Sequence, residues 1–301
     1  STPYPPAIVG SVRRVGLFVV KVEADAGGGT YHGTLAWSKA VAADHSAPIV
    51  APLDPWNGSL YEQVIVPGAD DKVYVWDADG TPWITNPPPG TPNGAFALSI
   101  DNNNPPRVSS NHSLSLAILS GAALYEPARI VQTLRHGHVV CWNTPARNSG
   151  ALATAYWETD VEPFAGHGSG GPALSTPAVG DVTGDGVADI VFTNQTVPLS
   201  DPPGLPDVEE RVYVLSRNGA VQYSYTDPNQ IVRFRSDEPW MPAPRPVIAC
   251  LDNSAAGAYF VVGADRDATG FEHTTWAFAV SSQAPYDLVR QQCTQKPPAP
   301  F

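Results

Sequence analysis

The strongest local signal for chemistry is a run of oxygen-bearing residues between positions 181 and 189. Loop positions 1, 3, 5, 7 and 9 could direct oxygen atoms inward: Asp181, Thr183, Asp185, Val187 (through its backbone carbonyl) and Asp189. Gly186, at position 6, permits the sharp reversal that such a loop needs. Oxygen ligands in this number suit Ca²⁺, and three neighbouring carboxylates repel one another unless a cation or water separates them. The segment predicts a calcium site, with a turn capped by its own side chains as the alternative.

The residues that follow this loop exclude an EF-hand. An EF-hand has a helix after the loop and a glutamate at position 12. Position 12 here is Phe192, and Ile190–Phe192 is typical of a strand. The calcium loop is therefore expected between two β-strands.

Strand signals dominate the rest of the chain. Runs rich in β-branched and aromatic residues recur between clusters of Gly, Pro, Asn and Asp. The clearest predicted strands are Gly16–Val22, Gln63–Pro67, Lys72–Trp76, Asp189–Thr193, Arg211–Leu215, Val221–Tyr225 and Ala258–Val262. With 32 prolines and 26 glycines in 301 residues, the chain is interrupted too often for long helices. The best helix candidate is the alanine-rich stretch Leu35–Ala43. The sequence predicts an all-β protein.

The strands recur in a repeated order. In each repeat a proline or small residue leads into an apolar strand, and the repeats begin near residues 6, 48, 116, 177 and 246. A second strand follows, then a third with the pattern V-x-[VC]-[WL], as in Val73–Trp76. Tight turns such as Asp79-Gly80 and Asn218-Gly219 come next, because hairpin turns favour these dipeptides. Four short antiparallel strands in each of about five repeats predict a β-propeller.

The propeller is expected to occupy residues 1–293, with five to seven blades possible. Residues 294–301, which are proline-rich, are expected to be a tail or linker. The main alternative fold is a β-sandwich, which would not require an internal repeat.

The segment 176–192 resembles the FG-GAP (VCBS-type) repeat, whose D-x-[DNT]-x-D-G-x-x-D loop binds calcium in integrin-like and lectin-like propellers. The resemblance implies a calcium-binding propeller. Asp54–Glu62 keeps the first and last acids of that motif but has Trp56 and Gly58 at its third and fifth places, so one calcium site is expected, not five. Blade ends such as Lys72–Trp83 are also similar to quinoprotein propeller repeats, which concerns packing and implies no quinone cofactor.

Charge and hydropathy exclude several classes of partner. The chain has 17 Lys and Arg against 29 Asp and Glu, a net charge of −12. A nucleic acid or an anionic membrane is therefore not expected as a partner. No apolar run approaches the roughly 18–20 residues of a membrane span, so no membrane insertion is expected.

The three cysteines, Cys141, Cys250 and Cys293, lie far apart and form no CxxC motif. A disulfide between Cys250 and Cys293 would tie the C-terminal segment to the last core strand. Buried free thiols are the equal alternative.

Three further groups of residues were weighed for function. Gly168–Pro172 resembles the nucleophile segment of chymotrypsin-like proteases, but no general-base histidine segment precedes it, which favours a linker. His136, His138 and Cys141 could bind a transition metal, but strand alternation places Cys141 on the other face from the histidines. Four tryptophans next to Pro, Gly or acidic residues are candidate platforms for a sugar ring or a protein: Trp56, Trp83, Trp157 and Trp240.

These patterns predict a secreted or cell-surface, calcium-binding β-propeller that acts as a lectin-like or adhesion module. Its partner would be a glycan or an extracellular protein. The alternatives are an enzyme on the same scaffold, such as a polysaccharide lyase or a quinoprotein-type dehydrogenase, and a structural spacer in a larger surface protein. A lyase should show a basic cluster near acidic residues, and this chain has only four lysines. Binding without catalysis is therefore favoured, and no catalytic residue is assigned.

Overall fold

The computed structural model contains β-strands and no α-helix in the part of the chain that it describes. The described residues are 7–12, 16–25, 29–41, 48–53, 62–68, 72–85, 93–97, 115–121, 126–133, 138–149, 153–161, 173–195, 211–226, 246–249, 259–264, 274–280 and 288–293. A search of these residues finds no helix long and apolar enough to cross a membrane.

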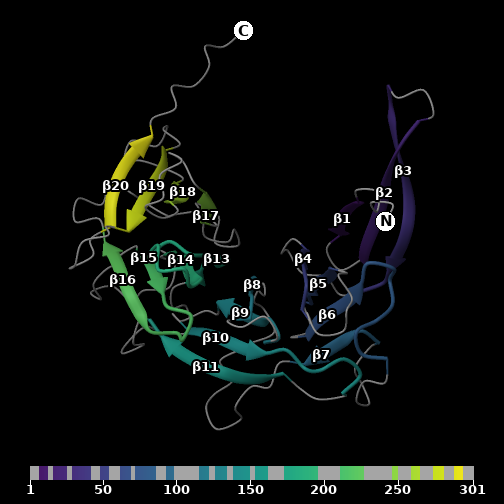
Figure 1. Cartoon of the computed structure of the whole chain (residues 1–301), viewed down its shortest axis with the longest axis horizontal. Coiled ribbons are helices and arrows are strands. Elements are labelled where there is room, and N and C mark those ends of the chain that lie inside the picture. Colours follow the sequence, from purple (N-terminus) through teal and green to yellow (C-terminus); the bar gives the residue numbers. More distant parts are fainter. Residues whose placement is uncertain are drawn as a thin grey trace, which may run out of the picture. The chain divides into compact units, whose positions relative to one another are not determined.

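The described strands form five small sheets (Figure 1). The first has the order β1 (Ala7–Val12), β2 (Gly16–Ala24), β3 (Tyr31–Lys39). The second has the order β4 (Ile49–Ala51), β5 (Gln63–Pro67), β6 (Lys72–Asp77), β7 (Ala95–Ala97). The third has the order β8 (Ser115–Leu119), β9 (Arg129–Thr133), β10 (His138–Asn143), β11 (Thr154–Asp160).

The fourth sheet contains β12 (Ala173–Leu174), β13 (Ala178–Gly180), β14 (Asp189–Gln195), β15 (Arg211–Leu215) and β16 (Val221–Thr226). Its first strand is split, since β12 and β13 both pair antiparallel with β14. The fifth sheet has the order β17 (Val247–Ala249), β18 (Tyr259–Ala264), β19 (Thr274–Val280), β20 (Leu288–Cys293).

The all-β prediction is confirmed for the described residues. Strands β1, β4, β8, β13 and β17 begin at residues 7, 49, 115, 178 and 247, next to the predicted repeat starts. The helix candidate is wrong: Leu35 through Lys39 belong to β3, where Leu35 pairs with Val20 and Trp37 with Val19 of β2. Pairing with β2 satisfies the backbone groups there, so tertiary context overrides the helix propensity of the alanines.

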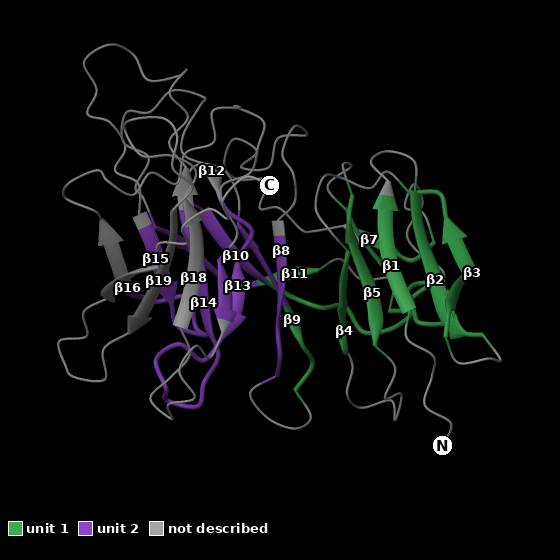
Figure 2. Cartoon of the chain, turned by 90° about the horizontal axis from the view of Figure 1, so that it is seen from above, with its two compact units in different colours: residues 1–114, 123–129, 142–155 green, residues 115–122, 130–141, 156–301 purple. Residues whose placement is uncertain are grey.

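The contacts divide the chain into two compact units (Figure 2). One comprises residues 1–114, 123–129 and 142–155; the other comprises residues 115–122, 130–141 and 156–301. The prediction of one domain over residues 1–293 stays a prediction.

In the first unit, the β1–β3 sheet packs face to face on the β4–β7 sheet. Leu17 and Val19 of β2 alternate into a buried cluster with Val66 and Trp76 of the second sheet. Trp37 of β3 packs against this cluster, with its ring centroid 6.2 Å from that of Trp76. Alternate residues of a strand point to opposite faces, so β2 uses one face for this core.

In the second unit, strands of the third and fourth sheets share a core in the same manner. Val139 and Cys141 of β10 are fully buried with Ile190 and Phe192 of β14. Phe192 stacks on Tyr213 of β15, with ring centroids 5.4 Å apart. This core adjoins the loop that the sequence marks for metal chemistry, because β14 leaves that loop at Asp189.

Candidate functional site

The candidate loop joins β13 to β14, and the sheet holds its two ends together. Gly180 at the end of β13 pairs with Asp189 at the start of β14. Val182 is 1% exposed, and Ala188 packs against the core cluster of its unit. The loop is therefore anchored by apolar contacts at both ends, and residues 184–187 lie at the surface between them.

Asp181 organises the turn of this loop. One of its carboxylate oxygens, Oδ1, accepts a hydrogen bond from the Gly184 N–H at 2.7 Å, and Oδ2 accepts one from the Gly186 N–H at 2.8 Å. Gly186 has φ +81°, a conformation that residues with a Cβ rarely adopt. The Asp181 carboxylate thus accepts hydrogen bonds from the backbone N–H groups of the loop, and Gly186 adopts the conformation that lets the chain reverse direction.

Asp189 is the buried acid of the loop, with 1% of its surface exposed. Its Oδ2 accepts the N–H groups of Val182 at 3.0 Å and Thr183 at 3.1 Å. Burial raises the pKa of this carboxyl, because the charged form loses hydration. The two N–H bonds oppose that shift in pKa, and the charge of Asp185 adds to it. A nearby cation would favour the charged form.

Asp185 and Val187 lie on the exposed side of the loop. Asp185 accepts a hydrogen bond from the Val187 N–H at 2.8 Å. The negative charge of Asp185 contributes to the raised pKa of Asp189. The Val187 side chain is 43% exposed.

Thr183 carries a buried hydroxyl oxygen that has no hydrogen-bond partner of normal geometry. The side chain nevertheless lies close enough to Asp189 to help lower the pKa of that carboxyl. A buried polar atom without a partner is unfavourable by about 1–3 kcal/mol.

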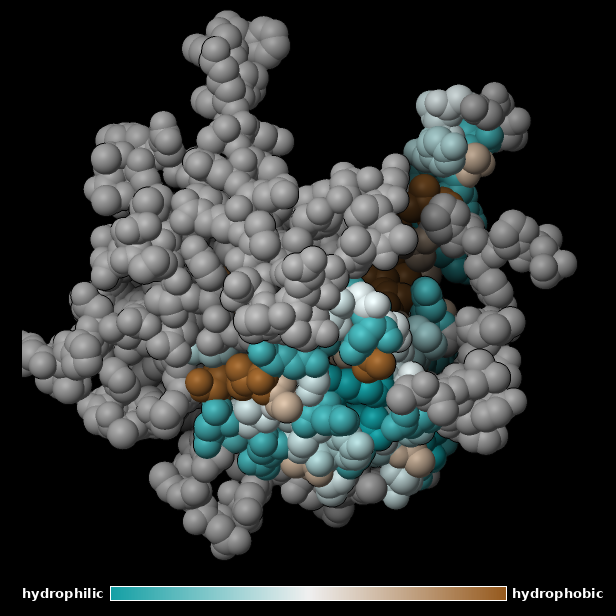
Figure 3. Space-filling view, turned by 60° about the vertical axis from the view of Figure 1, so that its left-hand side comes forward, coloured by the Kyte–Doolittle hydropathy of each residue, from teal (hydrophilic) through white to brown (hydrophobic). Residues whose placement is uncertain are grey.

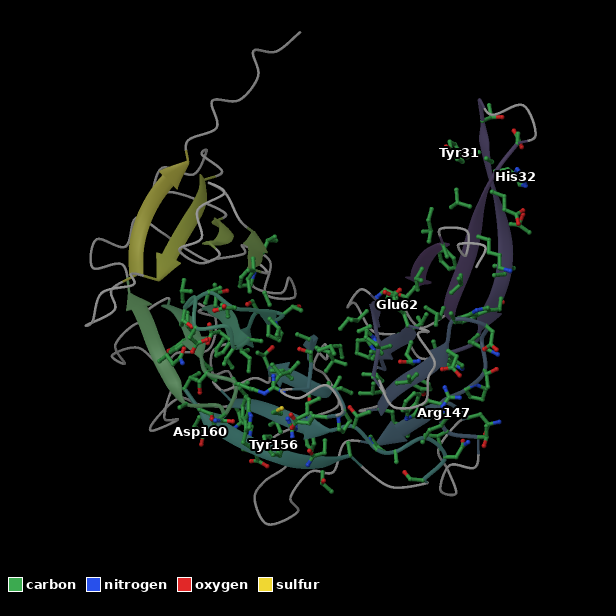
Figure 4. The ribbon with its side chains drawn as sticks, viewed as in Figure 1. Tyr31, His32, Glu62, Arg147, Tyr156 and Asp160 are labelled. Atoms are coloured by element: carbon green, nitrogen blue, oxygen red, sulfur yellow. The ribbon has the colours of Figure 1, made fainter. Side chains whose placement is uncertain are left out.

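The five predicted ligand residues thus lie on one loop and offer only oxygen donors, which fits a hard cation such as Ca²⁺. Their carboxylates, as placed, are directed at backbone N–H groups. Within the described ranges, no group of three or more Asp, Glu, His or Cys side chains converges as a metal site. The calcium assignment stays a prediction. Of the second, degenerate loop at Asp54–Glu62, only the exposed Glu62 is described (Figure 4).

Trp83 is packed inside the protein, so its interpretation as an exposed ligand platform is wrong. The side chain is 2% exposed, and its indole N–H donates to the Pro145 carbonyl at 3.1 Å. The Arg147 guanidinium lies 4.9 Å from the ring centroid and forms an ion pair with Asp77 (Figure 4). Next to it, Asn148 Oδ1 accepts the Thr85 N–H at 2.9 Å. These contacts fill the positions that a ligand would need.

Trp157 packs on a hairpin turn. Its indole N–H donates to the Arg217 carbonyl at 3.0 Å, in the turn that follows β15. A Cβ added at Gly219 would lie 2.6 Å from the Trp157 ring. One face of this half-buried ring and its indole N–H are therefore occupied by contacts within the protein. Ligand binding by the remaining surface of the ring stays a prediction. Trp56 and Trp240 lie outside the described residues.

A third tryptophan, Trp37, makes the same contact and was missed by the sequence interpretation. Its indole N–H donates to the Ala78 carbonyl at 2.9 Å, and its ring lies 3.0 Å from where a Cβ of Gly80 would be. The three tryptophan–carbonyl contacts span 41, 62 and 60 residues, about one repeat each. Because each partner carbonyl is known only from the fold, the sequence alone carries no signal that identifies these tryptophans as packing residues.

His138 and Cys141 are not brought together. His138 is buried between two carboxylates of β11: its Nδ1 lies 2.6 Å from Asp160 Oδ1, and its Nε2 lies 3.3 Å from Glu158 Oε2 (Figure 4). Acids on opposite ring nitrogens do not converge on one ion. Cys141 is buried in the core cluster of its unit. His136 and the Gly168–Pro172 segment lie outside the described residues.

The predicted disulfide is not tested. Cys250 lies outside the described residues, directly after β17, and Cys293 ends β20. The sheet order places β18 and β19 between those two strands.

No protein-family model matches this chain, and a comparison with curated proteins found no significant relative.

Proposed function

We propose that the five sheets are successive blades of a β-propeller of five to seven blades. Three observations support this arrangement. The sheets follow one another in sequence without exchanging strands. Within each unit, consecutive sheets pack face to face. Tryptophans of three sheets dock on the turn region of the next, at a spacing of about one repeat. Radial packing of such sheets is how propellers bury both faces of each blade.

The function that this scaffold and its loop favour is that of a calcium-stabilised binding module. The carrying observation is the buried Asp189 carboxylate, with the buried Thr183 hydroxyl oxygen beside it, in a loop whose other predicted ligands also offer oxygen atoms. Ca²⁺ would be held by Asp181, Thr183, Asp185, the Val187 carbonyl and Asp189. A carboxylate oxygen that accepts an N–H bond retains a lone pair for a metal, so the loop's own hydrogen bonds are compatible with binding.

In this proposal calcium stabilises the loop and performs no chemistry. The ion would neutralise the repulsion between Asp185 and Asp189 and lock the β13–β14 connection to the core below it. Such loops with a few carboxylates suit the high calcium levels outside cells. We therefore propose a secreted or cell-surface protein whose loops bind a glycan or an extracellular protein.

Isothermal titration calorimetry of the intact chain with Ca²⁺ and with Mg²⁺ tests the metal site. We expect Ca²⁺ to bind with a stoichiometry of one and Asp189→Asn to abolish binding. Asp79→Asn is the matched control, because Asp79 also caps a glycine turn through a backbone N–H. Absence of heat with wild-type protein, or equal loss in both variants, would contradict the site. A glycan array with and without calcium then tests the partner class.

A further inference from the structure

An asparagine followed by glycine can react with its own backbone, and the sequence contains three such pairs, at Asn57, Asn93 and Asn218. The backbone nitrogen of the glycine attacks the side-chain Cγ, and the amide group leaves as ammonia together with the proton of that nitrogen. Water then opens the resulting cyclic imide to aspartate or to isoaspartate, in which the backbone runs through the former side chain. Glycine has no Cβ to hinder this attack. Each pair is therefore a candidate deamidation site, and Asn57 lies outside the described residues.

Both backbone groups of Gly219 are bound in the turn between β15 and β16. Its N–H donates to the Ser216 carbonyl at 2.9 Å, and its carbonyl accepts the hydroxyl of Thr159 on β11 at 2.7 Å. The attack on Asn218 needs this nitrogen, and the peptide group must rotate to bring the nitrogen to the side chain. Because that rotation would break the hydrogen bond to Ser216, the turn as it stands does not allow the reaction.

The Trp157 ring opposes the same rotation. A Cβ at Gly219 would lie 2.6 Å from Trp157 Cε3, so the ring already lies against this glycine. The indole N–H donates to the Arg217 carbonyl at 3.0 Å. In the face shown in Figure 3, the described residues present mostly hydrophilic or neutral surface, with hydrophobic groups in separate patches. Undocking would break the indole bond and place more of an apolar ring in water, which is unfavourable.

The second described pair, Asn93-Gly94, is held in the same way by different residues. The Gly94 N–H donates to the Ile84 carbonyl at 2.8 Å, and the Gly94 carbonyl accepts the Val75 N–H at 2.8 Å. A Cβ at this glycine would lie 3.0 Å from Trp76 Nε1. In both described pairs the asparagine is exposed and the glycine is buried. The same protection thus occurs once in each compact unit.

We propose that Asn218 is a deamidation site that docking of Trp157 keeps unreactive. The reaction proceeds only in the fraction of molecules in which the ring has left the turn. Isoaspartate lengthens the backbone of the turn by one carbon, so the hydrogen bonds of the turn and the ring contact cannot all form again. Deamidation therefore makes a transient separation of β11 from the β15–β16 hairpin permanent. This inference rests on contacts within the second unit and is independent of the calcium proposal.

Peptide mapping by mass spectrometry measures the reaction at each asparagine separately. The intact chain is incubated in mildly alkaline buffer, either folded or in concentrated urea, and is digested afterwards. In urea, Asn93 and Asn218 should react at similar rates, because glycine follows both. In the folded wild-type protein both should react at least about tenfold more slowly, since only the open fraction of molecules is reactive.

Two variants test the role of the docked ring. Trp157→Ala should raise the rate at Asn218 several-fold toward its rate in urea. Asn93 is the matched internal control, because Trp76 of the other unit protects it, and its rate should stay unchanged. Thr159→Val removes only the hydroxyl that binds the Gly219 carbonyl, so it should raise the rate at Asn218 by a smaller factor. Circular dichroism checks that each variant is folded.

Equal rates at Asn218 in the folded wild-type protein and in urea overturn the proposal, because the turn would then be open to reaction. So does a folded Trp157→Ala variant in which Asn218 reacts as slowly as in the wild type. A variant that accelerates Asn93 to the same extent also overturns it, since unfolding of the whole chain would then control the reaction. Should Trp157→Ala fail to fold, an unchanged rate at Asn218 in Thr159→Val has the same force.

Discussion

Gly219→Ala is expected to destabilise the protein far more than Gly186→Ala. Both glycines have φ +81°, so both substitutions force an alanine into the same left-handed conformation. The difference lies in their surroundings. A Cβ at Gly186 would meet no atom within 4 Å, whereas a Cβ at Gly219 would lie 2.6 Å from Trp157 Cε3 and 2.7 Å from Trp157 Cδ2.

The magnitude follows from these contacts. The left-handed conformation costs about 1–2 kcal/mol for a residue with a Cβ, and the reduced freedom of the unfolded chain returns about 0.4–1 kcal/mol. Gly186→Ala should therefore lower the free energy of unfolding by about 1 kcal/mol. At Gly219 the overlap with Trp157 adds about 1–3 kcal/mol. Loss of the Trp157 indole bond to the Arg217 carbonyl adds about 1 kcal/mol, so the total is about 3–5 kcal/mol.

Urea unfolding in calcium-free buffer measures this difference. With slopes of about 1–3 kcal/mol per molar urea, the midpoint of Gly219→Ala should fall by about 1 M or more. Gly80→Ala provides a graded third case, because its Cβ would lie 3.0 Å from Trp37, and it should fall between the other two. Equal midpoints for Gly219→Ala and Gly186→Ala would refute the docking of Trp157 on this turn.

Three further predictions concern single side chains. Trp83→Phe keeps an aromatic ring but loses the hydrogen bond to the Pro145 carbonyl, so it should lower the free energy of unfolding by about 1 kcal/mol. Trp83→Ala should lower the free energy of unfolding by about 3–5 kcal/mol in the same urea assay. A wild-type urea midpoint for the alanine variant would contradict the burial of this ring. The Thr81 N–H holds the pKa of Asp79 below 3.8, so the stabilisation by Asp79 is present above pH 3.8 and lost as the pH falls through the folded-state pKa. The urea midpoints of wild-type protein and Asp79→Ala should therefore differ at neutral pH and converge in acid; a constant difference would exclude this linkage. Thr183→Val removes a buried hydroxyl that has no hydrogen bond of normal geometry, so it should change the calcium-free midpoint little while weakening Ca²⁺ binding in calorimetry; unaltered binding would exclude the hydroxyl as a ligand.

Local sequence predicted the strands well because their signals are local. Gln63–Pro67 and Arg211–Leu215 are runs of β-branched and aromatic residues between polar turns, and the structure gives them the predicted bounds. The turn glycines at 80 and 219 followed from the Asp-Gly and Asn-Gly dipeptides, and both have positive φ. In each case the residues that determine the conformation are neighbours in the chain.

Long-range contacts were beyond that reasoning. Trp83 lies among Pro and Asp residues that are typical of an exposed loop, but its partner Pro145 is 62 residues away. Leu35–Lys39 has the composition of a helix, and pairing with β2 makes it a strand. At the candidate loop, the spacing of the acidic residues identified them as candidate ligands. It did not reveal that Asp189 is buried, or that Asp181 accepts hydrogen bonds from the backbone N–H groups of the loop.

The melting temperature of the intact chain in excess chelator and in excess Ca²⁺ tests most directly whether residues 181–189 bind the ion. Calcium at about a hundred times its dissociation constant should stabilise the folded protein by about 2.7 kcal/mol. The account predicts a higher melting temperature with Ca²⁺, no such rise with Mg²⁺, and no rise in Asp189→Asn. The same melting temperature for the wild-type protein in chelator and in Ca²⁺ would contradict it.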